Sequence, residues 1–400
     1  MRRTRRILLL LITAILVTIG VIYSVQRETQ ARNAPPPPPV LPKEVNARAK
    51  EWSFEKTDGN RPIVRIFAQN FRQVAEGARF ELEHVRLHIF HKDGKVYDEV
   101  KSARADWNVD SEQLFSEGAV EISMGVQADT GKPSGNLVKI QSSGVSFDGK
   151  TGTASTERAA AFQFSRGEGT CTGARYDPSK RELQMHADVK LAWWGEKPDQ
   201  NRIEVETGSL IYNEVQSQAV LTPWTKFRRG TLSMESENSL VTVADGSLKQ
   251  VEAVKARGTD VQPKRQVQFA ADHMLLNFSA AGLIEKLIGT ESARFHSLSP
   301  TTHTNISSRR VDLDFVAIAE ESVLQKVVTN GSTTVESKPA VKSPTMPETR
   351  IIKSEVVLLH MRPGGEDIDK VETQSPGSIE FVPNRPGQRK RFVTGDYLLA

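Results

Sequence analysis

Three closely spaced histidines have the clearest capacity for chemistry in this sequence. His84, His88 and His91 lie in the segment FELEHVRLHIFHKDG, which spans residues 80–94. On a helix, their spacing would place all three imidazoles on one face, as a zinc site requires. The segment instead has the composition of a strand, in which His88 and His91 point to opposite faces. We therefore predict no metal site.

The other reactive residue types also lack the partners that catalysis needs. Cys171 is the only cysteine, so it has no disulfide partner, and no histidine lies near it in the sequence. Acidic pairs such as Glu320–Glu321 and Asp312/Asp314 fall in expected turns or on wet strand faces. Gly-rich phosphate loops, the Gly-x-Ser-x-Gly elbow and HExxH are absent. The sequence predicts no cofactor and no enzyme; an enzyme acting on lipid or glycan is the remote alternative.

The element that positions these residues is a β-hairpin with one dry face. In the stretch Gly173–Trp193, the turn Asp177–Lys180 contains Pro178, which presets φ for a turn. After the turn, apolar and polar residues alternate with a period of two, which indicates a strand buried on one side. The predicted dry face comprises Leu183, Met185, Ala187, Val189, Leu191 and Trp193, and the wet face comprises Gln184, His186, Asp188 and Lys190.

This hairpin pattern recurs along the chain. Clear copies span residues 102–123, 271–295 and 308–335, and weaker copies begin near 207, 237, 354 and 395. Their starts are roughly 30–46 residues apart, which is typical of repeat architectures. One hairpin cannot bury its apolar face alone, but a stack of hairpins can. The sequence therefore predicts an all-β array, with few helix signals after residue 26, and Gly395–Ala400 resembles the start of another repeat.

The N-terminal segment has the features of a membrane anchor. Residues 7–25 carry no charge and follow the sequence MRRTRR, which has four arginines. This predicts a transmembrane helix with a cytoplasmic N-terminus; a cleaved secretory signal is the alternative. Residues 26–50 form a linker in which Pro35–Pro39 favour polyproline II.

The charge balance excludes one class of partner. Lys and Arg number 53 against 49 Asp and Glu, and the four arginines before the apolar run account for the whole excess. The exported part is therefore neutral, which argues against a nucleic-acid surface. We predict that nucleic acid is not a partner.

Local details refine the predicted array. Arg61–Ala68 is the first expected strand, and Phe80–Phe90 is the next. In the latter strand, the apolar parity changes between Leu82 and Val85, which predicts a β-bulge near His84. Residues 125–136 are polar and Gly-rich and are expected to form a loop. Lys338–Thr349, which contains three prolines, is the one candidate break in the array.

Short phrases in these repeats resemble a known family. The phrases GARFEL, ARADWNV and EGAVEI, followed by GARYD and LQMHADVKL, are similar to periplasmic lipopolysaccharide-export proteins. Residues 1 to about 124 resemble LptC, the bitopic component, and residue 145 onward resembles the OstA/LptA module. LptC is much shorter, so the chain looks like an LptC-type anchor continued into LptA-like repeats. The expected segments are 1–6 cytoplasmic, 7–25 transmembrane, 26–50 linker, 51–135 LptC-like jellyroll and 136–400 OstA/LptA-like repeats.

The resemblance implies a fold, a function and partners. The expected fold is an OstA-like twisted β-jellyroll (a β-taco) with repeats stacked edge to edge into an open apolar groove. The implied function is shielding of lipopolysaccharide or a related lipid between an inner-membrane ABC transporter and the outer membrane. The implied partners also include OstA-like bridge proteins that bind by strand addition at exposed edges. The implied location is the inner membrane, crossed once, with the bulk of the chain in the periplasm.

The inward apolar faces supply the candidate lipid-binding residues. An ordinary closed core is the alternative interpretation of the same residues, and a periplasmic β-solenoid scaffold without lipid carriage is the alternative function. The candidate groove-lining residues are Phe80, Leu82, Val120, Ile122, Phe162, Phe164, Leu183, Met185, Val189, Leu191, Trp193, Met274, Leu276 and Phe278.

Overall fold

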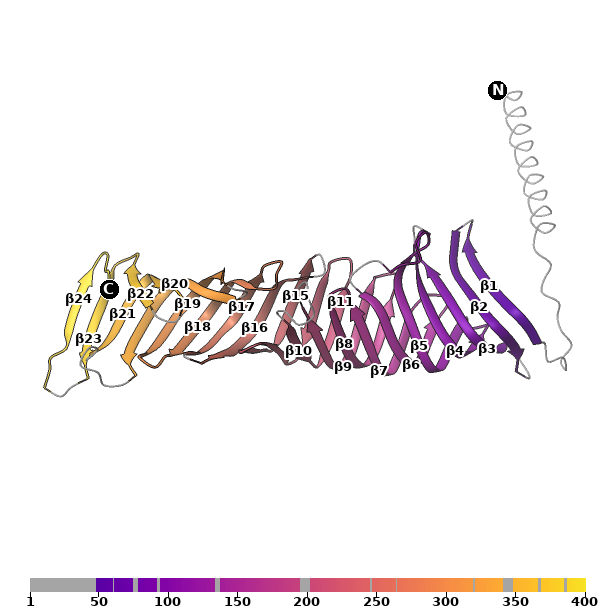
Figure 1. Cartoon of the computed structure of the whole chain (residues 1–400), viewed down its shortest axis with the longest axis horizontal. Helices are drawn as coiled ribbons and strands as arrows, with labels where there is room; N and C mark the ends of the chain where they lie inside the picture. Colours follow the sequence, from indigo (N-terminus) through magenta and orange to yellow (C-terminus); the bar gives the residue numbers. More distant parts are fainter. Residues whose placement is uncertain are drawn as a thin grey trace, which may run out of the picture. The chain divides into compact units, whose positions relative to one another are not determined.

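A computed structural model describes the chain from residue 48 to residue 400 (Figure 1). Residues 60, 75–77, 92–93, 134–136, 195–201, 245–246, 264, 319–320, 341–347, 366–367 and 385–386 are not described. The chain divides into two compact units, Met1–Asn46 and Ala47–Ala400, and the second holds every described residue. The predicted transmembrane helix at 7–25 and nearly all of the linker lie outside the described residues. Within them, no helix is long and apolar enough to cross a bilayer.

The described part of the chain is an all-β structure in which 24 strands form one sheet. The strands are β1 (Arg48–Asp58), β2 (Arg61–Gln73), β3 (Arg79–Phe90), β4 (Val96–Asn108), β5 (Gln113–Gln127), β6 (Leu137–Asp148), β7 (Ala154–Phe164), β8 (Gly167–Asp177), β9 (Glu182–Trp193), β10 (Ile203–Thr207), β11 (Ser209–Asn213), β12 (Gln218–Thr222), β13 (Thr225–Arg229), β14 (Leu232–Ser236), β15 (Asn238–Ala244), β16 (Ser247–Gln262), β17 (Arg265–Phe278), β18 (Ile284–Leu298), β19 (Thr302–Ile318), β20 (Glu321–Pro339), β21 (Glu348–Met361), β22 (Ile368–Thr373), β23 (Gly377–Pro383) and β24 (Arg391–Gly395).

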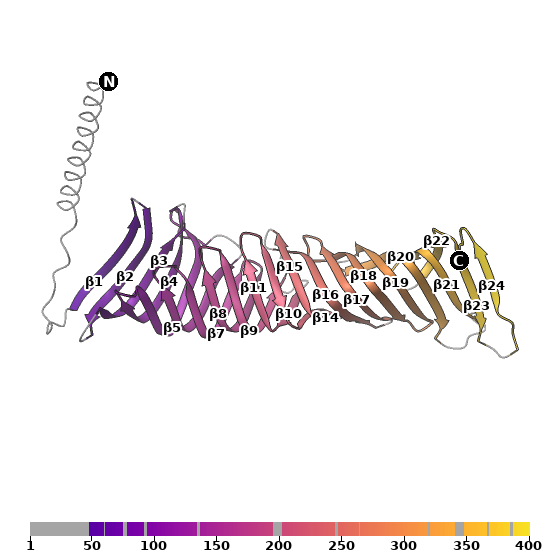
Figure 2. The same ribbon diagram turned by 180° about the vertical axis from the view of Figure 1, so that it is seen from behind.

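Strands pair antiparallel in chain order, so the unit is built by adding one strand after another (Figures 1 and 2). At β9 the pattern changes, because its two halves pair with different strands, β10 and β11. β12 and β13, and then β14 and β15, continue these two half-ladders. Both half-ladders end on the single long strand β16. Each pair of short strands therefore corresponds to one long strand broken at its middle.

The long strands also bend at their middles. The pairing register shifts at Ser116/Ala119 between β5 and β6, and at Asn330/Thr333 between β20 and β21. Such irregularities bend a strand and increase its twist. Buried hydroxyls satisfy the backbone at this fold line: Ser116 Oγ lies 2.9 Å from the carbonyl oxygen of Arg104. The fold line gives each long strand two arms that face each other.

A continuous apolar core lies between the arms. It runs without interruption from Val64 in β2 to Ile379 in β23. Alternation positions these side chains, because successive residues of a strand point to opposite faces. The outer face carries the charged residues, including exposed ion pairs such as Arg65–Glu55 at 3.0 Å. The all-β fold class is thus confirmed for the described residues, and the arrangement is consistent with the predicted β-jellyroll.

Several local predictions can be compared with the structure. Arg61–Ala68 lies in β2, but β1 precedes it, so it is the second strand. The predicted irregularity at His84 is confirmed: its φ is 52°, and Leu82 and Val85 are both buried. The predicted loop at 125–136 begins late, because β5 extends to Gln127.

The sheet also continues through both predicted segment boundaries. β5 and β6 pair along their length on either side of residues 134–136. β20 and β21 pair up to Ser337 and Arg350, which flank the candidate break. The backbone ladder therefore links the predicted segments into one sheet.

Candidate functional site

The structure places all of the predicted groove-lining residues on the inward face. Most are buried core residues, with relative exposures of 1–7%. Phe80 and Phe278 are partly buried and pack against the same core. The buried members are Leu82, Val120, Ile122, Phe162, Phe164, Leu183, Met185, Val189, Leu191, Trp193, Met274 and Leu276. Alternation therefore located the inward face, and the structure brings these residues into one cluster.

Sequence reasoning missed inward residues that obey the same rule. Leu87, Leu210 and Leu359 are 0–2% exposed, and Ile66 is fully buried. Each lies two residues from another inward apolar residue, so the signal was present in the alternation. A change of parity concealed part of it, because a left-handed residue such as His84, with φ 52°, shifts the inward pattern within a strand.

The interior is filled by side chains in this conformation. Across the interior, the rings of Phe54 in β1 and Trp107 in β4 lie 6.0 Å apart. A wholly apolar cavity of about 20 Å³, beside Phe227, Met234 and Phe278, is large enough for one water molecule but not for an acyl chain. Lipid entry would therefore require the two arms to move apart.

The three histidines do not converge. His88 lies 3.4 Å from Glu99, and burial lowers the pKa of its imidazole. His91 lies 3.2 Å from Asp98, and this hydrogen bond raises the pKa of His91. His84 is exposed at the strand irregularity. Among the described residues, no group of three His, Cys, Asp or Glu side chains could hold a metal ion.

Cys171 has the environment of a structural thiol. It is 3% exposed, and burial raises the pKa of its thiol to about 12. Its Sγ donates a hydrogen bond to the carbonyl oxygen of Gly173 at 3.2 Å. The thiol is therefore protonated at neutral pH and is not a nucleophile.

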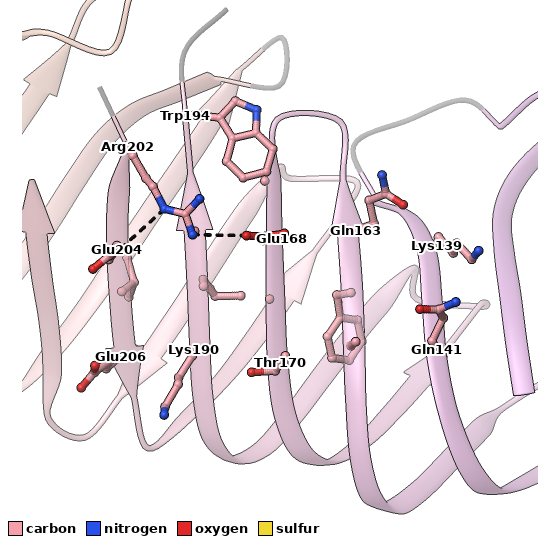
Figure 3. A pocket seen from close by; sticks show the side chains of 17 residues that line it. Lys139, Gln141, Gln163, Glu168, Thr170, Lys190, Trp194, Arg202, Glu204 and Glu206 are labelled. Atoms are coloured by element: carbon pink, nitrogen blue, oxygen red, sulfur yellow. Dashed lines mark hydrogen bonds and ion pairs between the residues drawn. The ribbon is translucent and has the colours of Figure 1, made fainter. Parts of the chain in front are cut away.

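A depression of about 670 Å³ lies on the outer face across β6–β10 (Figure 3). Arg202 bridges its wall, 3.2 Å from Glu168 and 3.5 Å from Glu204. Lys139 and Lys190 are balanced by Glu206 and by these two glutamates. Because the lining carries both signs of charge among polar and apolar groups, it suits neither acyl chains nor an anionic headgroup.

Comparison with known protein families finds a similarity for the N-terminal part of the chain. Residues 10–192 match the family described as "Lipopolysaccharide-assembly, LptC-related". This match covers β1–β8 and all but the last residue of β9. No curated protein matches the chain. Residues 10–192 are therefore similar to the LptC-related family of lipopolysaccharide assembly.

Proposed function

We propose that this protein is an inner-membrane-anchored periplasmic component of lipopolysaccharide export. Its two arms shield lipid acyl chains on their way from the inner-membrane ABC transporter toward the outer membrane. The observation that carries this proposal is the apolar core, which continues from β2 to β23. The family match supports the involvement in lipopolysaccharide assembly.

The energetics explain why such an interior suits the task. Each CH₂ group moved from an apolar environment into water costs about 0.8 kcal/mol, so a lipid with several acyl chains needs a continuous shield. The inward faces of successive strands provide apolar surface at every step along the sheet. A carrier with one isolated pocket would leave the chains exposed between sites.

The ends of the sheet fit the proposed partners. In the described part of the chain, β1 pairs only with β2, and β24 pairs only with β23. Unpaired strand edges offer backbone donors and acceptors to a further strand. We propose that OstA-like bridge proteins and the transporter complex dock at these edges. The segment 7–25 would hold the protein in the inner membrane with its bulk in the periplasm.

A second candidate function is a periplasmic β-solenoid scaffold that carries no lipid. The filled interior favours it, because the cavity beside Phe227 measures only about 20 Å³. The two functions differ in one respect: a conduit must admit lipid between its arms, and a scaffold never does.

Site-specific photocrosslinking distinguishes the two functions. Photoreactive groups are placed at the inward residues Leu191 and Phe278, in membranes that produce lipopolysaccharide and are supplied with ATP. The matched controls are Lys190 and Asn277, the adjacent residues on the outer face. ATP-dependent lipid adducts at the inward positions alone support the conduit. A folded protein without lipid adducts at either inward position would exclude it and leave the scaffold.

A further inference from the structure

The strand ends form two rims where the arms meet. The chain turns at a first rim after β1, β3, β5, β7, β9, β13, β16, β18, β20 and β23. It turns at a second rim after β2, β4, β6, β8, β11, β15, β17, β19 and β21. The apolar interior is bounded by the fold line on one side and by the two rims on the other. We call the seam along which the two rims meet the mouth.

Basic residues occupy several of the inward positions nearest the first rim. Inward register positions are mostly apolar, apart from buried hydroxyls and the buried Asp98 of β4, so a basic residue at a strand end marks the end of the dry surface. Each lies two residues from an apolar side chain of the same face. The described pairs are Phe54 with Lys56, Ile89 with His91, Phe164 with Arg166, Phe227 with Arg229, and Val267 with Arg265. Their recurrence over β1–β17 makes a row of positive groups along the mouth.

Three of these cations bind the opposite rim and so hold the mouth closed. Lys56 Nζ lies 2.7 Å from Glu112 Oε2, at the end of β4. Arg166 donates to Ser247 Oγ at 2.7 Å, at the start of β16. Arg265 donates to the carbonyl oxygen of Gly365, after β21. These contacts join strands 56–100 residues apart, so they bridge the arms and not neighbouring strands.

The other two cations are also at the boundary between water and the core. Arg229 lines the apolar cavity together with Phe278, and burial lowers the pKa of its guanidinium. His91 approaches the second rim, where Arg181 and Glu214 form an ion pair at 2.8 Å. At the second rim, the inward end positions hold Glu112, Glu214 and Arg181. Basic side chains therefore recur along the first rim, where His91 pairs with buried Asp98, whereas the second rim carries both signs of charge.

We propose that this mouth is a lateral gate, and that its first-rim cations are the headgroup site for a phosphate-bearing lipid with several acyl chains. The proposal rests on the lipid carriage proposed above. When the rims separate, Lys56 and Arg166 lose their acceptors on the second rim. Phosphate oxygens, which accept charge-assisted hydrogen bonds from Lys and Arg, take the place of these acceptors. The acyl chains then contact the apolar residues two positions further inward.

The gate is tested by linking the rims. In a full-length protein with Cys171→Ala, Arg166→Cys and Ser247→Cys are joined by a bis-maleimide, and lipid adducts are measured at Leu191. Lys255→Cys with Glu237→Cys is the control, because this exposed 2.7 Å pair joins residues at one fold line and leaves the mouth free. The linked mouth is expected to lose the adducts, while the control link retains them.

Each other outcome is informative. Adducts that persist in the rim-linked protein would overturn the gate while leaving lipid carriage intact. Adducts absent at Leu191 from the Cys171→Ala protein that retains Arg166 and Ser247 would overturn lipid carriage, and the gate with it.

The headgroup assignment is tested by substituting the cations and their acceptors in separate variants. Lys56→Gln with Arg166→Gln removes the charges, and Glu112→Ala with Ser247→Ala removes the acceptors; both pairs weaken the closure. We expect the first pair to lower the adduct yield about tenfold, equivalent to ~1.4 kcal/mol of lipid binding, and the second to maintain or raise it. Equal changes in both pairs would show that the cations only close the mouth, and would overturn the headgroup site.

Discussion

The strands β1–β9 and the strands β16–β24 share one architecture but differ in their relation to known sequences. The family match ends at residue 192, within β9. Beyond it, long bent strands, inward apolar residues and a fold line continue through β21. The fold therefore depends on alternation and on a bend at the middle of each strand, and many different sequences can meet these two requirements.

The two regions differ most at the fold line. In the family-matched region, Ser102 and Ser116 form an isolated hydroxyl pair at 2.6 Å. In the later region, Ser308, Thr333 and Thr329 form a chain of hydroxyls, with O–O distances of 3.0 and 2.8 Å. This denser network accompanies the longest strands, β19 and β20.

The largest expected effect tests whether both regions are equally well packed. Leu87 in β3 and Leu359 in β21 are both fully buried. Leu→Ala at either site leaves a cavity, with an expected cost of ~2–5 kcal/mol. Amide hydrogen exchange of the flanking strands measures this cost locally. A loss at Leu87 without a loss at Leu359 would contradict an equivalent core in the later region.

The next effect tests the hydroxyl network. Thr329 Oγ1 lies 3.1 Å from both the amide nitrogen and the carbonyl oxygen of Val357. Thr329→Val keeps the shape but leaves these buried groups unsatisfied, at an expected cost of ~1–3 kcal/mol. Thr329→Ser retains the hydroxyl and is the control. Equal exchange protection of β20 and β21 in the two variants would show that the hydroxyl does not support the bend.

A smaller effect concerns the backbone at the bend. Gly331 has φ +98°, and an added Cβ would lie 2.7 Å from the Arg309 Cβ. Gly331→Ala is therefore expected to cost ~1–2 kcal/mol. Gly118 in β5 has no atom within 4 Å of an added Cβ, so Gly118→Ala is the matched control. Thermal unfolding should separate the two variants; indistinguishable midpoints would refute the strain at Gly331.

The smallest effect is a pH dependence in which two histidines of the family-matched region oppose each other. The hydrogen bond to Asp98 raises the pKa of His91, so its stabilisation is complete below the unfolded value of 6.5 and is lost as pH rises through the higher folded value. Burial lowers the pKa of His88, so stability is retained above 6.5 and falls on acidification. His91→Gln should remove the gain at acid pH, and His88→Gln should reduce the loss. Amide hydrogen-exchange protection of β3 and β4 is measured from about pH 8 to pH 5. A shift of stability in the same direction in both variants would contradict this expectation.

Strand identity and the inward face could be predicted from the sequence because alternation is local. Leu183, Met185 and Leu191 follow a period of two, and the structure buries all three. The turn at Asp177–Lys180 could also be predicted from its residue types. In the structure, Asp177 Oδ1 accepts a hydrogen bond from the Ser179 amide at 3.0 Å.

The joining of the arms could not be predicted, because it depends on residues far apart in the chain. Arg166 and Ser247 meet across the mouth, yet neither carries a local signal of the other. Similarly, the sheet divides at β9 because β10 and β11 pair with different halves of the same edge of that strand. Local periodicity therefore predicted the faces of the sheet but not how its arms close.

The central claim is that one lipid path runs through both regions. The most direct test is a time course of photocrosslinking at inward residues along the sheet, at Leu87, Leu191, Leu276 and Leu359, after ATP is added to lipopolysaccharide-producing membranes. The account predicts lipid adducts at all four sites, appearing first in β3 and last in β21. Adducts confined to Leu87 and Leu191, with none at Leu276 or Leu359, would contradict a continuous path and limit lipid carriage to the family-matched region.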